Sequence, residues 1–219
     1  MLAWFEKFAE VIIVTLLGIV SVATAYVSFQ ASLYDSKMFQ EYAVGQSMKT
    51  EAESMYLEAN QQYAQDAQTL VALDQLAVEM ESSNGQIAAL AQAKYDALYY
   101  GGVSEVFGEA IDRANAANEQ SDEEYVSPQE DEAYLEDLFG AYSEKNVAAE
   151  EKMKTGDSFN SLSDKLILYT VLMALSLFLL GVAAVVAKVT TRFSISAIAM
   201  VIFTVTAFLS ALVPFASID

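Results

Sequence analysis

The chain of 219 residues combines a hydrophobic composition with a strong negative charge. Hydrophobic residues make up 54% of it, yet 30 acidic against 11 basic residues give a net charge of −19. It has no cysteine and no histidine, which excludes disulfides, thiolate nucleophiles, imidazole bases and zinc, haem or iron–sulfur sites built on these residues. The charge also disfavours nucleic acid and anionic lipid headgroups as partners.

Residues 11–29 form the first hydrophobic segment, which carries no charge. Their number is close to the roughly 20 residues that a transmembrane helix needs. A cleavable signal peptide is the alternative, because Lys7 precedes the segment and Ala23-Thr24-Ala25 has the small-x-small pattern of a cleavage site. The hydrophobic run continues beyond that site to Phe29, which favours an uncleaved anchor.

Residues 30–81 predict one long helix, because they contain no proline, a single glycine and many good helix formers. No stop signal separates this segment from the first span, so we expect the helix to continue out of the membrane as a stalk. Apolar or small residues recur along it at spacings of three and four, which predicts a packed face. This stripe comprises Met48, Ala52, Met55, Ala59, Tyr63, Ala67, Leu70, Leu73, Ala77 and Met80.

The next segments predict shorter helices. Ser82-Ser83-Asn84-Gly85 is the first clear break, residues 86–100 form a helix, and Gly101-Gly102 ends it. Ser104 precedes an amphipathic helix that reaches about residue 118, and residues 119–127 are polar and acidic. If Gly101-Gly102 forms a hairpin turn, these helices run antiparallel and contribute to a bundle of up to four helices.

A returning helix is predicted from Pro128 onward. Ser127 is placed to cap it, proline suits the first helical position, and Glu130 can reach back to the cap. Apolar residues then carry one face of this helix back toward the membrane. Thr155-Gly156-Asp157 predicts a kink before the next hydrophobic segment.

Two further uncharged segments, residues 166–187 and 193–218, predict a closing pair of transmembrane helices. The turn between them contains Lys188 and Arg192 and no acid, whereas residues 30–164 carry 27 acids against seven bases. The positive-inside rule therefore places this turn and the N-terminus in the cytoplasm, and the acidic region and the C-terminus outside.

The predicted fold class is all-α, with three transmembrane helices and a long extracytoplasmic helical bundle as a stalk. We divide it into an N-terminal transmembrane helix (1–29), an acidic helical bundle (30–164) and a transmembrane hairpin (165–219). The expected location is a bacterial or archaeal cell membrane. The acidic balance also agrees with a high-salt habitat.

Carboxylates are the main candidates for chemistry. Acidic residues cluster at 122–124 and 130–132, where Ca²⁺ binding is one interpretation and a solvated acidic surface the other. The sequence has no EF-hand loop, phosphate-binding glycine loop or nucleophile elbow. We therefore expect no catalytic residues, no cofactor and no metal, and interpret the protein as a non-enzyme.

Small residues in the spans are the candidate partner-binding positions. The spans contain no ionisable group, and the hydroxyl groups in them can bond to the backbone of their own helices. Small side chains let helices approach closely, either among the three spans of one chain or against another protein. The positions are Gly18, Ser21, Ala25, Gly181, Ala207 and Ala211. The expected partners are membrane lipid and other membrane protein subunits or a second copy of the chain.

The order of parts resembles an uncharacterised family of small bacterial membrane proteins, with one N-terminal span, a helical soluble region and two C-terminal spans. The resemblance rests on Phe29-Gln30-Ala31-Ser32, Ser36-Lys37, Ser47-Met48-Lys49 and the basic turn at residues 188–192. The chain departs from the family in its greater acidity and in residues 101–127, which resemble an insert. The resemblance implies no activity.

These features favour a non-catalytic accessory or scaffold subunit of a membrane protein complex, assembled through its spans and helical stalk. The alternative is a homo-oligomeric membrane channel or gating module, because pores lined by hydroxyl or apolar groups need no charge. A sensor with an extracytoplasmic ligand-binding bundle is a third hypothesis. It requires a separate signalling partner, since the cytoplasmic parts are short.

Overall fold

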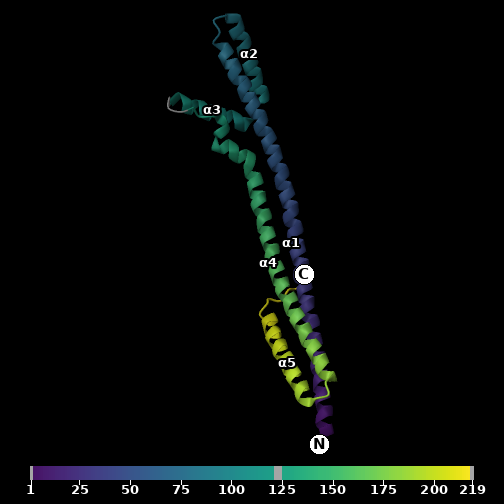
Figure 1. The fold of residues 1–219 in the computed structure, drawn as a ribbon. Helices are drawn as coiled ribbons and strands as arrows, with labels where there is room; N and C mark the ends of the chain where they lie inside the picture. The colour runs from purple at the N-terminus through teal and green to yellow at the C-terminus, as the bar shows by residue number, and fades with distance from the viewer. Residues whose placement is uncertain (1, 121–124, 218–219) are drawn as a thin grey trace. The chain divides into compact units, whose positions relative to one another are not determined.

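The computed structural model describes residues 2–120 and 125–217, with side chains from Glu10 onward. This part of the chain is helical and contains no strand (Figure 1). Its elements are α1 (Leu2–Met80), α2 (Gly85–Gly102), α3 (Glu105–Gln120), the 3₁₀ turn η1 (Pro128–Glu130), α4 (Glu132–Val185) and α5 (Val189–Ala211). The chain divides into two compact units, Met1–Val44 with Glu151–Asp219, and Gly45–Glu150.

Three helices are long and apolar enough to cross a membrane: α1, α4 and α5. The all-α class and three candidate transmembrane helices predicted from the sequence are therefore confirmed. Large apolar side chains such as Val14, Val22 and Phe208 are exposed on these helices. Such exposure suits side chains that lipid covers in a membrane.

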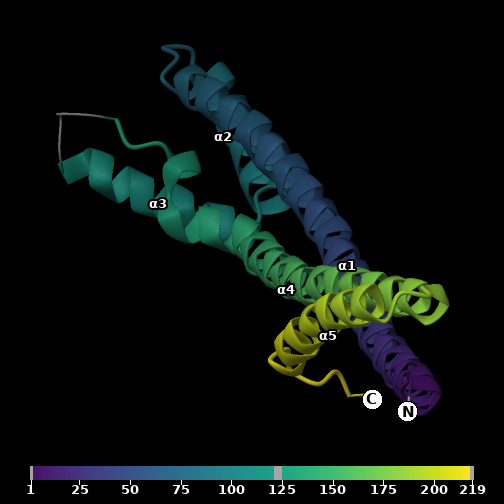
Figure 2. The same ribbon diagram turned by 60° about the horizontal axis from the view of Figure 1, so that its bottom comes forward.

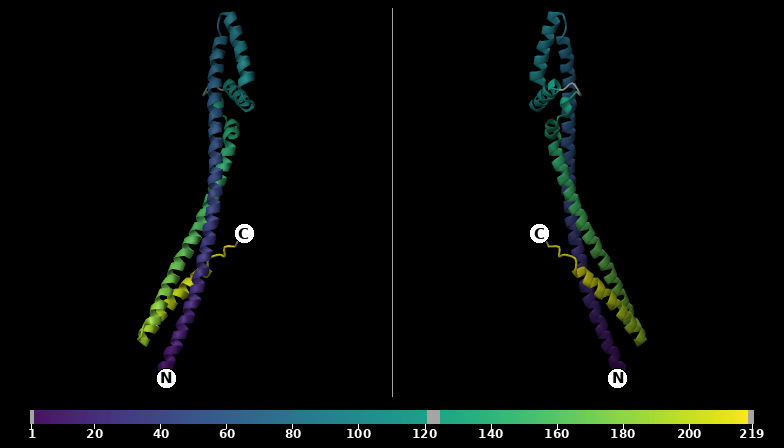
Figure 3. Two further views of the ribbon diagram at one scale, coloured as in Figure 1. Left: turned by 90° about the vertical axis from the view of Figure 1, so that its right-hand side faces the viewer. Right: turned by 90° about the vertical axis from the view of Figure 1, so that its left-hand side faces the viewer.

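The first unit packs α1 against α4 and α5, and α5 lies beside the end of α4 that precedes it (Figures 1 and 3). Val20, Leu180 and Ala199 form one buried cluster, with one residue from each helix. A second cluster contains Val27, Ala31, Tyr34, Leu166, Met173 and Ala216. Ser163 adds a buried hydrogen bond, because its Oγ donates to the carbonyl oxygen of Ala31 at 3.1 Å.

Gly156, where the sequence predicts a kink, lies within a continuous helix. Helix α4 runs without interruption from Glu132 to Val185 through Thr155-Gly156-Asp157. A Cβ at Gly156 would lie 2.6 Å from Cδ1 and Cε1 of Tyr42, so glycine is required for the close approach of this ring to the helix backbone. The Tyr42 hydroxyl then donates to Oδ1 of Asp157 at 2.6 Å.

The second unit contains the end of α1, α2, α3, η1 and the start of α4. After the break predicted at residues 82–85, α2 folds back along α1, and the Asn84 side chain caps it by accepting from the Gln86 N–H. Four helices share one core around Leu73, Phe107, Ile111 and Tyr134.

Helix α3 differs from the sequence expectation of an antiparallel hairpin. It runs across α1 and α2 instead of along them (Figure 2). Its buried residues Phe107, Ala110, Ile111 and Ala114 lie on one face at helical spacing. This face packs into the shared core, so burial of the stripe sets the direction of α3.

The start of the returning helix also differs from the prediction. Ser127 and Pro128 begin the short turn η1, in which the Ser127 hydroxyl accepts from the Gln129 N–H. Helix α4 begins afterwards, at Glu132, and Asp131 caps it by accepting from the Tyr134 N–H at 2.9 Å. The Asn118 side chain exchanges two hydrogen bonds with the backbone of Val126, which joins the end of α3 to this turn.

Candidate functional site

The three small residues predicted on the first span lie on an exposed side of α1. Gly18, Ser21 and Ala25 are exposed, whereas Val20 and Val27 are buried in the packing with α4 and α5. A Cβ at Gly18 would meet no atom within 4 Å. These three residues therefore do not take part in packing among the spans of one chain.

The other three candidate residues have different surroundings. Gly181 on α4 is half-buried, and a Cβ there would also meet nothing within 4 Å. Ala207 on α5 packs against the cluster that contains Met173, which agrees with the intramolecular interpretation. Ala207 and Ala211 both line a cavity among α1, α4 and α5. The structure does not bring the six residues together into one site.

Most hydroxyl groups of the spans are engaged within their own helices, although Oγ of Ser196 is buried without a hydrogen-bond partner. Seven of the engaged hydroxyls donate to the carbonyl oxygen four residues earlier, as the sequence predicts for hydroxyls in an apolar segment. This group comprises Thr15, Thr24, Thr170, Ser176, Thr204, Thr206 and Ser210.

Outside the spans, α1 carries an apolar ridge that the sequence analysis did not identify. The ridge consists of Leu57, Ala64, Val71 and Val78, which are separated by seven residues each. Leu57, Val71 and Val78 are 69%, 55% and 72% exposed, and Ala64 is also exposed. Seven-residue spacing keeps side chains on one side of a helix over several turns. The ridge is therefore a row of apolar side chains on one side of α1 in the second unit.

The middle of this ridge is free of exposed charge. Residues 59–73 contain a single charged residue, Asp66, and it is fully buried, whereas Glu58, Asp74 and Glu79 are exposed near the two ends of the ridge. The positions four residues after the first three members of the ridge are Gln61, Gln68 and Gln75. Depletion of charge beside apolar side chains is typical of the centre of a protein interface.

Asp66 lies inside the second unit and fixes the packing of α1 against α4. Its Oδ2 accepts a hydrogen bond of 2.7 Å from the Tyr134 hydroxyl, and its Oδ1 accepts from Nε2 of Gln62 at 3.0 Å. Asp66 and Tyr134 are both almost completely buried. Burial, together with the Asp66 carboxyl, raises the pKa of Tyr134 well above its usual value. The hydroxyl therefore remains a donor at physiological pH.

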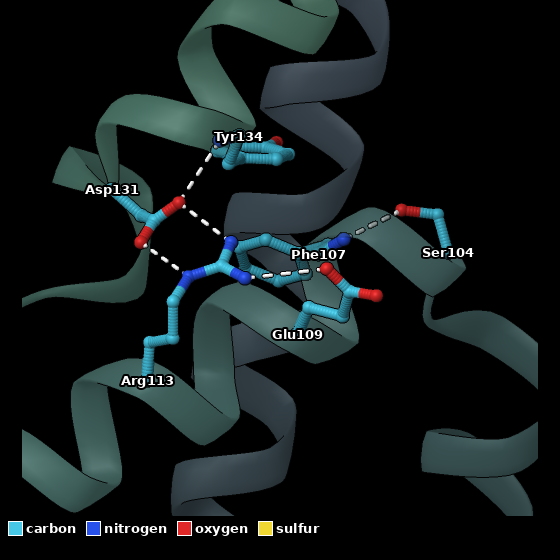
Figure 4. A network of polar contacts seen from close by, with 6 residues as sticks. All are labelled: Ser104, Phe107, Glu109, Arg113, Asp131 and Tyr134. Carbon is cyan, nitrogen blue, oxygen red and sulfur yellow. Dashed lines mark hydrogen bonds and ion pairs between the residues drawn. The ribbon is translucent and has the colours of Figure 1, made fainter.

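Arg113 and Asp131 form the polar network that joins α3 to α4 (Figure 4). Nε and Nη2 of Arg113 each donate to one oxygen of Asp131 at 2.8 Å, and Nη1 donates to Glu109 at 3.2 Å. The guanidinium, helped by the Tyr134 N–H, lowers the pKa of Asp131 to about 2. Asp131, and to a lesser extent Glu109, in turn raise the pKa of Arg113.

Only one of the two predicted acidic clusters, residues 130–132, lies within the described residues. Asp131 pairs with Arg113 and caps α4, so its oxygens are committed to these contacts. Within residues 10–120 and 125–217, whose side chains the structure describes, no three acidic side chains gather where they could hold a metal ion. Asp122, Glu123 and Glu124 lie outside the described residues.

Arg192, which belongs to the basic turn predicted to lie in the cytoplasm, is largely buried. Its Nε donates to the Val186 carbonyl oxygen at 3.1 Å, just after the end of α4, and its Nη1 lies 3.9 Å from a carboxyl oxygen of Glu10. Arg192 thus closes the turn between α4 and α5. The predicted orientation uses two positive charges in this turn, Lys188 and Arg192, and Arg192 also has this structural role within the turn.

Comparison with known protein families, with curated proteins and with solved structures finds no match to this chain.

Proposed function

We propose that the protein is a non-catalytic accessory or scaffold subunit of a membrane protein complex, assembled through its spans and its helical stalk. The exposed apolar ridge of Leu57, Ala64, Val71 and Val78 carries this proposal. Burying a side chain of this size against a partner stabilises association by about 1.5–3 kcal/mol before the costs of association are counted. A chain with a net charge of −19 can associate here because residues 59–73, in the middle of the ridge, expose no charge.

The proposal includes the orientation in which the acidic second unit lies outside the cell. Lys188 and the low positive charge of residues 30–164 support it. The exposed face of Gly18, Ser21 and Ala25 supplies a second surface, at membrane depth, for the same assembly.

The channel alternative receives less support than the scaffold. A pore lined by hydroxyls requires polar groups directed away from their own helices, but seven hydroxyls of the spans donate to their own backbones. Recordings from purified protein in planar bilayers distinguish the two. Reproducible conductance steps would favour the channel.

Cross-linking in native membranes tests the ridge directly, because the chain has no cysteine of its own. A maleimide–diazirine reagent is attached to Val71→Cys on the ridge, and to Val147→Cys on α4 as a matched control. The two valines are 55% and 54% exposed. We expect a discrete product at position 71, with a second copy or another membrane protein, and none at position 147.

Equal cross-linking at both positions, or none at either, would contradict the proposal. Val71→Glu provides an independent measurement, since a carboxylate on the ridge should dissociate the detergent-solubilised assembly, whereas Val147→Glu should leave its size unchanged.

A further inference from the structure

The apolar ridge of α1 has a helical repeat, and this repeat limits the shape of a partner that can cover it. Its members lie on the side of α1 opposite the core, because the residue two positions after each of the first three is buried, and two residues are about 200° apart around a helix. These buried residues are Ala59, Asp66 and Leu73. At about 1.5 Å per residue, the row from Leu57 to Val78 is about 32 Å long. A second helix of about 22 residues, with apolar side chains at the same spacing, covers such a row along its whole length.

Acidic side chains lie beside both ends of the ridge. Glu53 and Glu58 are exposed near its first member, four residues before it and one residue after it. Asp74 and Glu79 are exposed at the other end, where they line one surface hollow with the last two members of the ridge. Within residues 10–120 and 125–217, none of these four carboxylates takes part in an ion pair. Both ends of the ridge therefore present negative charge that a partner can pair.

A second copy of the chain would bring the wrong charges to this surface. Residues 50–93, which include the whole ridge, contain no lysine and no arginine. Two copies paired through the ridge, parallel or antiparallel, would therefore place carboxylates near carboxylates without a cation from this segment to pair them. Like charges brought together across an interface oppose association. The charge around the ridge thus favours a partner with a different sequence.

The middle of the ridge differs from its ends. Residues 59–73 expose no charge, and Ala64 within them has a small side chain. An apolar centre with a charged periphery is the usual arrangement of a protein interface, in which burial at the centre gives affinity and the charges at the edge select the partner. A partner that complements this surface is apolar opposite the middle and cationic opposite the two ends.

We infer that the ridge binds an amphipathic helix of a different subunit, which carries apolar residues at seven-residue spacing and lysine or arginine near both ends of that row. Its cations face Glu53 and Glu58 at one end of the ridge, and Asp74 and Glu79 at the other. This inference rests on the proposed assembly through the ridge and adds the chemistry of the partner.

Binding of designed peptides to the full chain in dodecyl maltoside tests this chemistry, with fluorescence anisotropy of a dye on the peptide as the measurement. The probe is a helical peptide of about four heptads, with leucine at the core positions and lysine at the flanking positions near its two ends. One control peptide has glutamate in place of the lysines. A second control keeps the lysines and has serine in place of the leucines. We expect the wild-type chain to bind the probe and neither control.

Charge reversal beside the ridge should weaken binding of the same probe. Glu58→Lys combined with Asp74→Lys is expected to weaken it on the order of tenfold at low salt, and this difference should shrink as the salt concentration rises. Asp137→Lys combined with Glu144→Lys is the matched control, because it changes the net charge equally at two exposed acids on α4. This control should bind the probe nearly as the wild type does.

The inference would be overturned if the wild type failed to bind the probe, or bound either control peptide as tightly. Equal weakening by the two double variants would also overturn it, since the charge beside the ridge would then have no special role. Val71→Cys cross-linking between copies with two different tags separates this failure from failure of the proposed assembly. A product with both tags would overturn the inference and leave the assembly supported, whereas no product at position 71 contradicts the assembly itself.

Discussion

The buried hydrogen bond between Tyr134 and Asp66 permits a precise test of how the second unit is held together. Tyr134→Phe removes only the hydroxyl and retains the ring, which packs 4.9 Å from Phe107 and 6.3 Å from Tyr63, centroid to centroid. It leaves Oδ2 of Asp66 without its partner at 2.7 Å inside a fully buried environment.

The expected cost follows from this geometry. A buried polar atom that loses its hydrogen bond lowers the free energy of unfolding by about 1–3 kcal/mol. Because Asp66 is completely buried, we expect a loss of about 2 kcal/mol for Tyr134→Phe. At 1.4 kcal/mol for each factor of ten, local opening of the second unit should become about 30-fold more frequent. The effect should appear in α1 and α4 around positions 66 and 134.

Amide hydrogen exchange of the full chain in detergent, followed by mass spectrometry, measures this opening. Tyr100→Phe is the matched control, because Tyr100 is 84% exposed and its hydroxyl faces solvent. We expect the control to leave exchange in both segments unchanged. An acceleration by Tyr134→Phe no greater than that by Tyr100→Phe would refute the assignment of the Asp66–Tyr134 bond as a stabilising contact.

Three further predictions concern single residues. The pKa of Asp131 is lowered to about 2, so its interactions stabilise the fold at pH above about 4 and are lost as the pH falls toward 2. In thermal melts, the stability difference between the wild type and Asp131→Asn should therefore shrink between these pH values. A difference that stays constant would contradict this role of Asp131. Asp131→Ala at pH 7 removes the α4 cap as well as the Arg113 pair, so it should cost at least the about 1 kcal/mol of the cap, measured as lower helix protection in hydrogen exchange near residue 132. Gly156→Ala should lower the melting temperature, because the added Cβ meets the Tyr42 ring at 2.6 Å. Gly101→Ala is the control and should leave the melting temperature unchanged, because its Cβ meets nothing within 4 Å. Equal melting temperatures of the two variants would show that the Tyr42 ring moves freely.

Sequence patterns were sufficient for the elements of this fold, because hydrophobic length and helix-breaking residues act locally. The three candidate spans, the continuous helix α1 and the break before α2 all followed from such signals. The predicted stripe on α1 was largely right: Ala52, Ala59 and Leu73 are buried, although Ala77 is exposed.

Contacts between distant residues could not be predicted in this way. Asp66 is a charged residue in a polar stretch, and its burial depends on Tyr134, 68 positions later. Gly156 resembles a helix breaker until Tyr42 is placed against it. Gln30 appears as an ordinary polar residue at the end of a span, and only the folded segment after α5 shows that one of its donors is left unpaired.

The central claim is the proposed orientation, in which the acidic second unit lies outside the cell. Cysteine labelling in intact cells tests this orientation most directly. The cysteine-free chain allows single replacements at Tyr100, in the second unit, and at Ala187, in the turn between α4 and α5. A membrane-impermeant maleimide should label Tyr100→Cys in intact cells and Ala187→Cys only after the membrane is permeabilised. Labelling of Ala187→Cys in intact cells, with Tyr100→Cys protected until permeabilisation, would contradict the account.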